Sequence, residues 1–316
     1  MPKILVTGAT GFVGKSLVPA LIQAGHDVLC AVSSNADWLL AKQVVINRIE
    51  LQSDWSELLQ GVDVVIHLAA RVHVMKDTVA SPWDEFYKIN SLATKNLAQQ
   101  AAQHGVKRFV FLSSIKVNGE FTLDKQPFTE DSIAQTEDPY GKSKLQAEQY
   151  LKTISQETGM EVVILRPPLI FGPGVKANFL KMMDLVQKGW PLPFGKINNK
   201  RTFIYIDNLV SAICTVVVEP EAANQTYLLA DDDSWSLSEL LSFLAEQMNV
   251  RLTLFKVPGL MFLFNLPGLK NMKLRLLGSL EVSNNKIKSQ LGWVPPVTSA
   301  EGLSKTVRWY KDECNS

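Results

Sequence analysis

The sequence predicts an α/β protein built on a doubly wound parallel sheet, followed by a smaller C-terminal substrate-binding region. Short apolar runs alternate with stretches of helical period through the first half of the chain. These runs are continuously apolar, which is typical of strands buried on both faces of a parallel sheet. A glycine-rich turn follows the first run directly. We therefore expect helices on both faces of the sheet.

The elements of the first half follow in a regular order. The expected strands are KILVT, DVLCAV, a weaker VVINRIE, VDVVIHLAA, KRFVFLSS and EVVILRPPLIFG. The first helix lies in GATGFVGKSLVPALIQAG and ends at Gly25, and the next is DEFYKINSLATKNLAQQAAQHG. A third helix begins at Asp138 and Pro139, which are favoured as N-cap and first helical residue.

The pattern of the sequence becomes less regular after residue 166. Prolines become frequent, and the expected elements are a helix near 177–188, a strand and helix in TFIYIDNLVSAICTVVVE, a short strand QTYLLA, and helices near 236–249 and 299–311. We therefore predict a first domain over residues 1–165 and mainly a substrate region over 166–316. A segment near 202–218 is expected to return to the first domain.

Composition excludes several classes of function. The 316 residues carry 32 Lys plus Arg against 31 Asp plus Glu, net +1, so nothing favours nucleic acid or an anionic membrane as a partner. Three scattered cysteines and four scattered histidines indicate neither disulfides nor a metal site. The first strand starts at Ile4, where a signal peptide would have an apolar segment, so we expect a cytoplasmic protein.

The most apolar stretch, VPGLMFLFNLPGL from Val257, is too short for a membrane span and is interrupted by Asn265 and Pro267. We interpret it as a buried segment of the substrate region. An exposed apolar lid or interface is the alternative.

The glycine-rich turn VTGATGFVG predicts a dinucleotide site of Rossmann type. Its glycines lie between the first strand and the first helix, where they allow a tight turn, a close approach to a pyrophosphate and a helix N-terminus facing that anion. The residues assigned to the cofactor here are Gly8, Thr10, Gly11, Phe12, Val13 and Gly14.

The choice between NADP and NAD rests on the end of the second strand. NAD-preferring sites carry an acidic residue there, whereas this chain has Val32 followed by Ser33 and Ser34. Nothing repels a 2'-phosphate, but no arginine is present to bind one. We favour NADP, with NAD as the alternative. In HLAA, small residues would let the cofactor ribose approach or would simply pack, and Leu68, Ala69 and Ala70 are assigned to the cofactor.

The segment DPYGKSKLQAE places Tyr140 and Lys144 on one face of a helix. A phenol with a pKa of about 10 needs a drop of roughly 3 units to act near neutral pH. A lysine one turn away and the positive end of the helix both lower the pKa. Taken alone, the spacing favours a solvated surface helix, because both residue types are common.

The glycine motif, HLAA, FLSS and YGKSK, in this order, resemble the extended short-chain dehydrogenase/reductases of the NAD-dependent epimerase/dehydratase family, in its nucleotide-sugar branch. LRPPLIFGPG and RTFIYIDNLVSAI resemble the second half of that branch. The resemblance implies that Ser114 hydrogen-bonds the sugar oxygen, Tyr140 transfers its proton, and Lys144 lowers the tyrosine pKa and holds the nicotinamide ribose. It also assigns Pro167 to the cofactor, and it favours Ser114 over Ser113.

The segment SSIKVNG distinguishes members of this branch. Sugar 4,6-dehydratases carry an Asp-Glu pair where this chain has Ile115 and Lys116, so the resemblance argues against dehydration. The 4-epimerases carry a small hydroxyl residue in place of Lys116 and a tyrosine in place of Asn118. Lys116 is assigned to the substrate, with a solvent-facing side chain as the alternative.

SSIKVNGE and GVKANFLKMM most resemble the UDP-4-keto-6-deoxy-N-acetylhexosamine 4-reductases of O-antigen synthesis, which form UDP-N-acetylquinovosamine and are often called UDP-glucose 4-epimerase. We therefore expect such a reductase. A UDP-glucose or UDP-N-acetylglucosamine 4-epimerase is the alternative. A redox-sensing NAD(P)-binding regulator is a third, which the intact tyrosine and lysine argue against.

The resemblance also indicates which residues bind the UDP part of the substrate. Arg201 matches a diphosphate-binding arginine, and guanidinium geometry suits phosphate. Asn178 matches an asparagine that reaches the same diphosphate, although a helix cap is its alternative role. Leu192 resembles part of an apolar strip beside the uracil, and Arg275 is a second phosphate candidate. The family further implies a homodimer through a helix pair that includes the Tyr140 helix.

Overall fold

The large part of the molecule is a seven-stranded parallel sheet. The structure, a computed structural model, describes residues 1–46, 50–72, 82–124, 126–257 and 277–314. The strand order is β3-β2-β1-β4-β5-β6-β9, and all neighbours run parallel. The strands are β1 (Lys3–Thr7), β2 (Asp27–Val32), β3 (Lys42–Val45), β4 (Val64–His67), β5 (Arg108–Leu112), β6 (Glu161–Arg166) and β9 (Thr226–Leu228).

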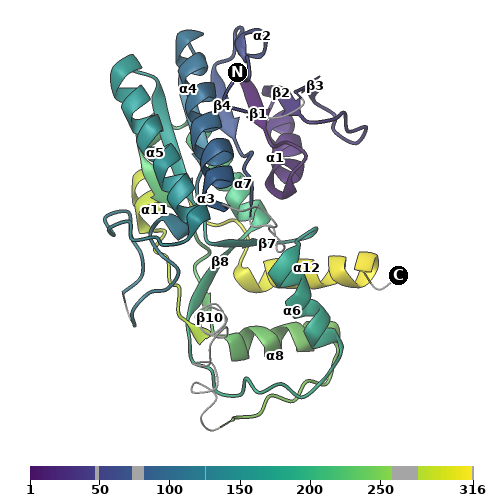
Figure 1. Ribbon diagram of the computed structural model, residues 1–316. Coiled ribbons are helices and arrows are strands. Elements are labelled where there is room, and N and C mark those ends of the chain that lie inside the picture. The colour runs from purple at the N-terminus through teal and green to yellow at the C-terminus, as the bar shows by residue number, and fades with distance from the viewer. Residues whose placement is uncertain (47–49, 73–81, 125, 258–276, 315–316) are drawn as a thin grey trace.

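Helices cover both faces of this sheet (Figure 1). Alternate residues of β1 point to opposite sides: Ile4 joins the core beneath α1 and α7, and Leu5 joins the core beneath α4 and α5. One face carries α1 (Phe12–Gln23) and α7 (Ile206–Val218). The other carries α2 (Ser56–Leu59), α3 (Pro82–Phe86), the π-helical turn η1 (Tyr87–Leu92), α4 (Ala93–Gln103) and α5 (Pro139–Thr158). The expected doubly wound fold is confirmed.

A smaller mixed sheet lies beyond the carboxyl ends of the large one. Its strand order is β10-β8-β7, with β7 and β8 parallel and β10 antiparallel to β8. Stacked and edge-on rings of Phe171, Phe179 and Phe203 pack between its strands and α6. The elements around this sheet are β7 (Leu169–Phe171), β8 (Arg201–Tyr205), β10 (Ser234–Trp235), α6 (Ala177–Gln187), α8 (Leu237–Met248) and α12 (Ser299–Cys314). Three elements pack on the large part instead: the turn η2 (Ile115–Val117) on α5, the turn η3 (Pro220–Ala222) on α7, and α11 (Asn285–Leu291) on β9 and η3.

Two expected elements differ from the sequence pattern. The single strand expected in EVVILRPPLIFG is two strands, β6 and β7, which belong to different sheets because Pro167 and Pro168 interrupt the ladder. The helix expected from Asp84 to Gln103 contains the π-helical turn η1. The apolar stretch from Val257 lies almost wholly outside the described residues. Among the helices that are described, none combines the length and apolar character that a bilayer crossing requires.

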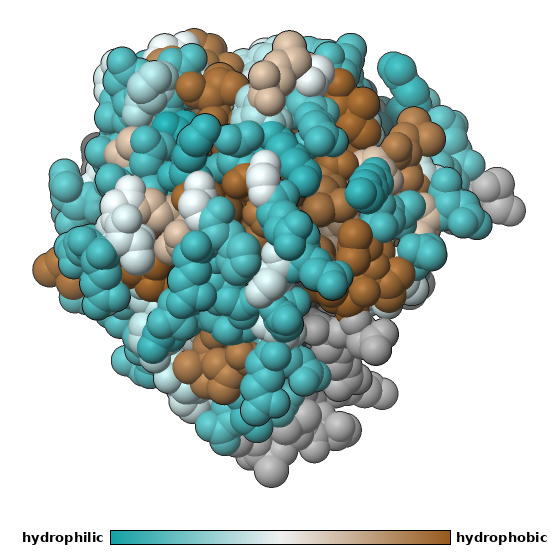
Figure 2. Space-filling model, turned by 90° about the horizontal axis from the view of Figure 1, so that it is seen from above, coloured by the Kyte–Doolittle hydropathy of each residue, from teal (hydrophilic) through white to brown (hydrophobic). Residues whose placement is uncertain are grey.

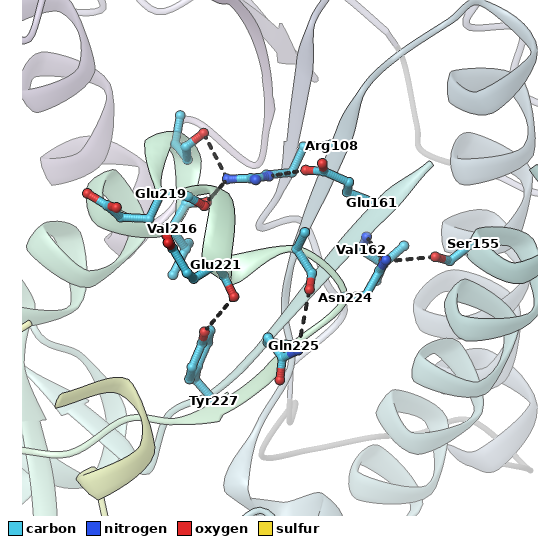
Figure 3. A network of polar contacts seen from close by, with 12 residues as sticks. Arg108, Ser155, Glu161, Val162, Val216, Glu219, Glu221, Asn224, Gln225 and Tyr227 are labelled. Carbon is cyan, nitrogen blue, oxygen red and sulfur yellow. Dashed lines mark hydrogen bonds and ion pairs between the residues drawn. The ribbon is translucent and has the colours of Figure 1, made fainter. Parts of the chain in front are cut away.

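A polar network ties α7 to the amino-terminal edge of the large sheet (Figure 3). The guanidinium of Arg108 donates to the Glu161 carboxylate at 2.7 Å and to the carbonyl oxygens of Val216 and Glu219 at 2.7 and 2.9 Å. These carbonyls lie at the C-terminal end of α7, where helical groups lack internal partners and a cation is favourable. The network therefore fixes where α7 ends.

A hollow of about 510 Å³ at this same edge is lined in part by Asp63, Lys107, Arg108 and Glu161. These charges pair with one another, Lys107 with Asp63 and Arg108 with Glu161. Viewed from above, the surface at this end is mainly hydrophilic with separate apolar patches (Figure 2). Ligands of doubly wound sheets bind at the opposite, carboxyl edge, so the hollow is not the candidate site.

The buried carboxylate of Asp231 joins the two parts of the fold. It accepts hydrogen bonds from the backbone N–H of Tyr205, the Asn208 side-chain amide at 2.7 Å and the Ser299 hydroxyl at 3.2 Å. Asp231 is 2% exposed, and burial raises its pKa to about 6. Its donors come from the start of α7 and of α12, so one side chain sets the position of both helices.

Asp231→Ala is expected to lower the free energy of unfolding by about 3 kcal/mol, because three buried donors lose their acceptor. Urea denaturation followed by circular dichroism measures the change. Asp233→Ala is the matched control, since that carboxylate is exposed, and a loss below about 0.5 kcal/mol is expected. Equal losses in the two variants would contradict the role given to Asp231.

Candidate active site

The glycine-rich turn between β1 and α1 admits no side chain at two of its glycines. Gly8 has φ +73°, and a Cβ there would lie 2.7 Å from the backbone nitrogen of Ala69. A Cβ on Gly14 would lie 2.5 Å from the carbonyl oxygens of Gly8 and Ala9. Gly11 is the N-cap of α1 and offers no side chain to its first turn. The N–H groups of that turn can therefore face an anion, as a pyrophosphate site requires.

A pocket of about 150 Å³ opens beside this turn at the carboxyl ends of the central strands. Among the described residues that line it there is no carboxylate, and their polar side chains are the hydroxyls of Thr10 and Ser33. Such a lining fits the adenosine end of a dinucleotide without repelling a 2'-phosphate. The residues that line it are Gly8, Thr10, Ala31, Val32, Ser33, Ile46 and Ala69. Ala31 and Ile46 were not predicted, since the pairing of β2 with β3 that brings Ile46 there involves no motif.

The other residues assigned to the cofactor lie around this turn in different ways. Val13 is 8% exposed and belongs to the core, so only its backbone is available to a ligand. Phe12, Leu68 and Ala70 are half-buried. His67, directly before Leu68, is buried between the hydroxyls of Thr7 and Thr94, and burial lowers its pKa to about 3. This histidine is therefore neutral and serves packing.

Tyr140 and Lys144 occupy the first two turns of α5, as the sequence predicts. Asp138 is the N-cap, and its carboxylate accepts the Gly141 N–H at 2.9 Å. Lys144 is 1% exposed, and its Nζ donates to the carbonyl oxygen of Leu112 at 2.8 Å. Burial lowers the pKa of Lys144 to about 7, against the opposing charge of Glu148.

The pKa of the Tyr140 phenol is shifted in the direction opposite to the one expected. Its pKa is raised above the ordinary value, first by burial and second by the negative charge of Asp138. The Lys144 Nζ lies 6.0 Å from the centroid of the Tyr140 ring. The sequence predicted a lowered pKa from the lysine and the helix end alone. The burial of the ring and the effect of the Asp138 carboxylate, which raise the pKa, cannot be derived from helix spacing.

The two adjacent serines after β5 have different surroundings. Ser113 is 3% exposed and donates to the Glu148 carboxylate, which also accepts two hydrogen bonds from Arg166. Ser114 is half-buried, and its Oγ accepts the Lys116 N–H at 3.2 Å. The Ser114 hydroxyl therefore keeps its own proton for a ligand. This arrangement favours Ser114 as the serine that contacts substrate.

Lys116 makes a contact that neither sequence interpretation includes. Its Nζ donates to the Asp138 carboxylate at 2.9 Å and lies 3.9 Å from Glu120. The same Nζ is 5.9 Å from the centroid of the Tyr140 ring. The negative charge of Glu120 partly opposes the lowering of the Arg201 pKa by burial. Glu120, which no motif indicates, thus acts electrostatically on the arginine predicted to bind diphosphate.

The residues predicted to bind the nucleotide end lie in the smaller part of the molecule. Arg201 begins β8 and donates to the carbonyl oxygen of Gly278 at 3.0 Å. Asn178 is exposed in the first turn of α6. Leu192 is 6% exposed and joins the core, so little of its side chain is available to a ligand. Pro167 follows β6 directly, and Arg275 lies outside the described residues.

Known structures share this architecture. A Thermotoga maritima UDP-glucose 4-epimerase with UDP-glucose matches with TM-score 0.79 at 24% identity, covering 99% of both chains. A Bacillus cereus UDP-glucuronic acid 4-epimerase with NAD matches with TM-score 0.79 at 22% identity, covering 98% of this chain and 99% of that one. RMD from Pseudomonas aeruginosa, complexed with NADPH, matches with TM-score 0.74 at 24% identity over 99% and 100%.

Sequence comparison is more specific. A Vibrio cholerae protein described as UDP-glucose 4-epimerase is 44% identical over 322 aligned residues, which cover 98% of this chain and 95% of that protein. The model of the NAD dependent epimerase/dehydratase family matches residues 4–230, which include the glycine turn, Ser114, Tyr140 and Lys144. The chain therefore belongs to the NAD dependent epimerase/dehydratase family.

Proposed function

We propose that this protein is a 4-epimerase of a UDP-hexose, acting on UDP-glucose or UDP-N-acetylglucosamine. The observation that carries the proposal is the presence of Ser114, Tyr140 and Lys144, the residues predicted to transfer the proton, at the carboxyl edge of the sheet in a chain 44% identical to a described UDP-glucose 4-epimerase. That relative supports the epimerase better than the reductase expected from SSIKVNGE. The reductase remains the second candidate, because Lys116 and Asn118 depart from the usual epimerase pattern.

The side chains supply the proton chemistry at C4. Tyr140 is the group that takes the proton of the C4 hydroxyl and returns it, and Ser114 donates a hydrogen bond to the same oxygen. Lys144, one turn away and buried, favours the tyrosinate by its charge. A nicotinamide dinucleotide, when bound at the glycine turn, supplies hydride chemistry. Elimination of water would need a carboxylic acid after Ser114, where the chain has the buried Ile115.

The two ligand regions follow the division of the chain. We propose that residues 1–165 bind the dinucleotide and that residues 166–316 bind mainly the nucleotide sugar, with Arg201 and Asn178 at its diphosphate. NADP and NAD both fit the pocket that Ser33 lines. A homodimer through a helix pair that includes α5 stays a prediction. A role in O-antigen synthesis stays a prediction too. In the structure α4 lies beside α5 on the same face of the sheet (Figure 1).

Denaturing the protein as purified, with no nucleotide added, is expected to release near-stoichiometric NAD, identified by mass spectrometry. An epimerase returns the hydride to the same sugar, so its cofactor stays bound. A reductase consumes a cosubstrate that must exchange at every turnover. Protein that is empty or carries traces of NADP would contradict the epimerase and support the 4-ketoreductase.

Tyr140→Phe is expected to lower kcat by about 1000-fold, because the group that transfers the C4 proton is lost. Binding of UDP by calorimetry should stay within about twofold, since the phenol does not contact the nucleotide. Tyr150→Phe removes a hydroxyl from the same helix, where it contacts only Tyr87 among the bonds described. It is expected to keep full activity. An active Tyr140→Phe enzyme would end the proposed mechanism.

Ser33→Asp is expected to raise the ratio of Kd for NADP to Kd for NAD by about tenfold or more, because a carboxylate at the pocket repels a 2'-phosphate and accepts from ribose hydroxyls. Fluorescence titration with both dinucleotides measures the ratio. Ser34→Asp is the control, since Ser34 is exposed and does not line the pocket. An unchanged ratio in Ser33→Asp would place the adenosine ribose elsewhere.

A further inference from the structure

The carboxylate of Asp138 both caps helix α5 and pairs with Lys116. Oδ1 of Asp138 accepts the Gly141 N–H at 2.9 Å, and Oδ2 accepts from Nζ of Lys116 at 2.9 Å. The Asp138 side chain is 7% exposed, whereas that of Lys116 is 31% exposed. A carboxylate this buried requires a partner charge. Lys116, from the turn after β5, provides that charge across 22 residues of sequence.

Tyr140 lies next to this pair. The Lys116 Nζ is 5.9 Å and the Lys144 Nζ 6.0 Å from the centroid of its ring, so the phenol lies near two cations and one carboxylate. From α3 the ring contacts Phe86, which carries no charge. Among the described residues, the other charged groups on elements packed against α5 are exposed or have partners of their own: Asp84 is exposed, Glu85 pairs with Lys88, Lys95 lies over the Tyr150 ring, Arg166 pairs with Glu148, Glu161 pairs with Arg108, and Glu120 lies 3.9 Å from the Lys116 Nζ.

We propose that Lys116 is a positioning residue for Tyr140: its ammonium holds the N-cap carboxylate of α5 and so fixes the first turn of that helix and offsets the Asp138 charge beside the phenol. The proposal rests on the proposed function, in which Tyr140 transfers the proton. It gives Lys116 no contact with substrate.

The charges predict opposite effects for the two partners. Without the Lys116 ammonium, the Asp138 charge is unbalanced, and the tyrosinate becomes harder to form. Without the Asp138 charge, the tyrosinate becomes easier to form. At about 6 Å and partial exposure, each change is expected to move the Tyr140 titration by about one pH unit. Because the effects have opposite signs, removing both charges should leave the titration nearly unchanged.

The test is a charge cycle in the intact protein. Lys116→Met keeps the length of the side chain, and Asp138→Asn keeps a favoured N-cap residue. The titration of Tyr140 is measured as near-ultraviolet tyrosinate absorbance, each variant minus the same variant carrying Tyr140→Phe. Lys116→Met is expected to titrate about one unit higher than wild type, Asp138→Asn about one unit lower, and the double variant within about 0.3 units.

Turnover provides the second measurement. The pH profile of kcat/KM should shift to higher pH in Lys116→Met, with a loss of about tenfold near neutral pH that is recovered at alkaline pH. Lys116→Arg should restore the wild-type profile. Lys142→Met is the control, since that exposed lysine in the first turn of α5 pairs with the exposed Glu137, which precedes the helix, and its profile should match wild type.

Three results would overturn the proposal. They are an unshifted Tyr140 titration in Lys116→Met, shifts of the same sign in the two single variants, and a loss of turnover that is equal at every pH. The absorbance titration needs no turnover, so it stays informative if Tyr140→Phe proves active, in which case the proposed function fails and the charge coupling is still measured.

Discussion

The position of α5 is fixed by two buried basic side chains, and the candidate site depends on that position. Lys144 donates to the Leu112 carbonyl at the end of β5, and Arg166 at the end of β6 binds the Glu148 carboxylate one turn further along the helix. Removing one partner of such a pair leaves an uncompensated buried charge, which is strongly unfavourable. The helix therefore has one register against the sheet, and Tyr140 has one place relative to the glycine turn.

The candidate site needs two kinds of surroundings, and different segments of the chain provide them. The close backbone approach at Gly8 and Gly14 needs space without side chains, whereas proton transfer needs side chains held by charge. The parallel sheet satisfies both because its strands all end at one edge. The turn after β1 supplies the open backbone, and the segments after β5 supply Ser114 and the helix that carries Tyr140.

Much of this could be predicted from the sequence because the signals are local. Apolar runs, capping residues and glycines fixed the order of elements from β1 to β6 and placed Tyr140 and Lys144 on one helix face. The rest depends on contacts between distant segments. The pairing of Lys116 with Asp138 and the effect of the Glu120 charge on Arg201 follow from no periodic pattern in the sequence. The raised pKa of Tyr140 can be predicted only when the burial of its ring is known. The separation of β6 from β7 can be predicted only when it is known that they belong to two different sheets.

The seventh strand of the large sheet has a consequence for biosynthesis. β9 comes from residues 226–228, and the helix α7 that covers α1 ends only at Val218. A nascent chain therefore has β6 as an unpaired edge and part of the α1 core in water until more than two thirds of it has been translated. A fragment ending near residue 165 would therefore expose a sheet edge that invites association with other chains.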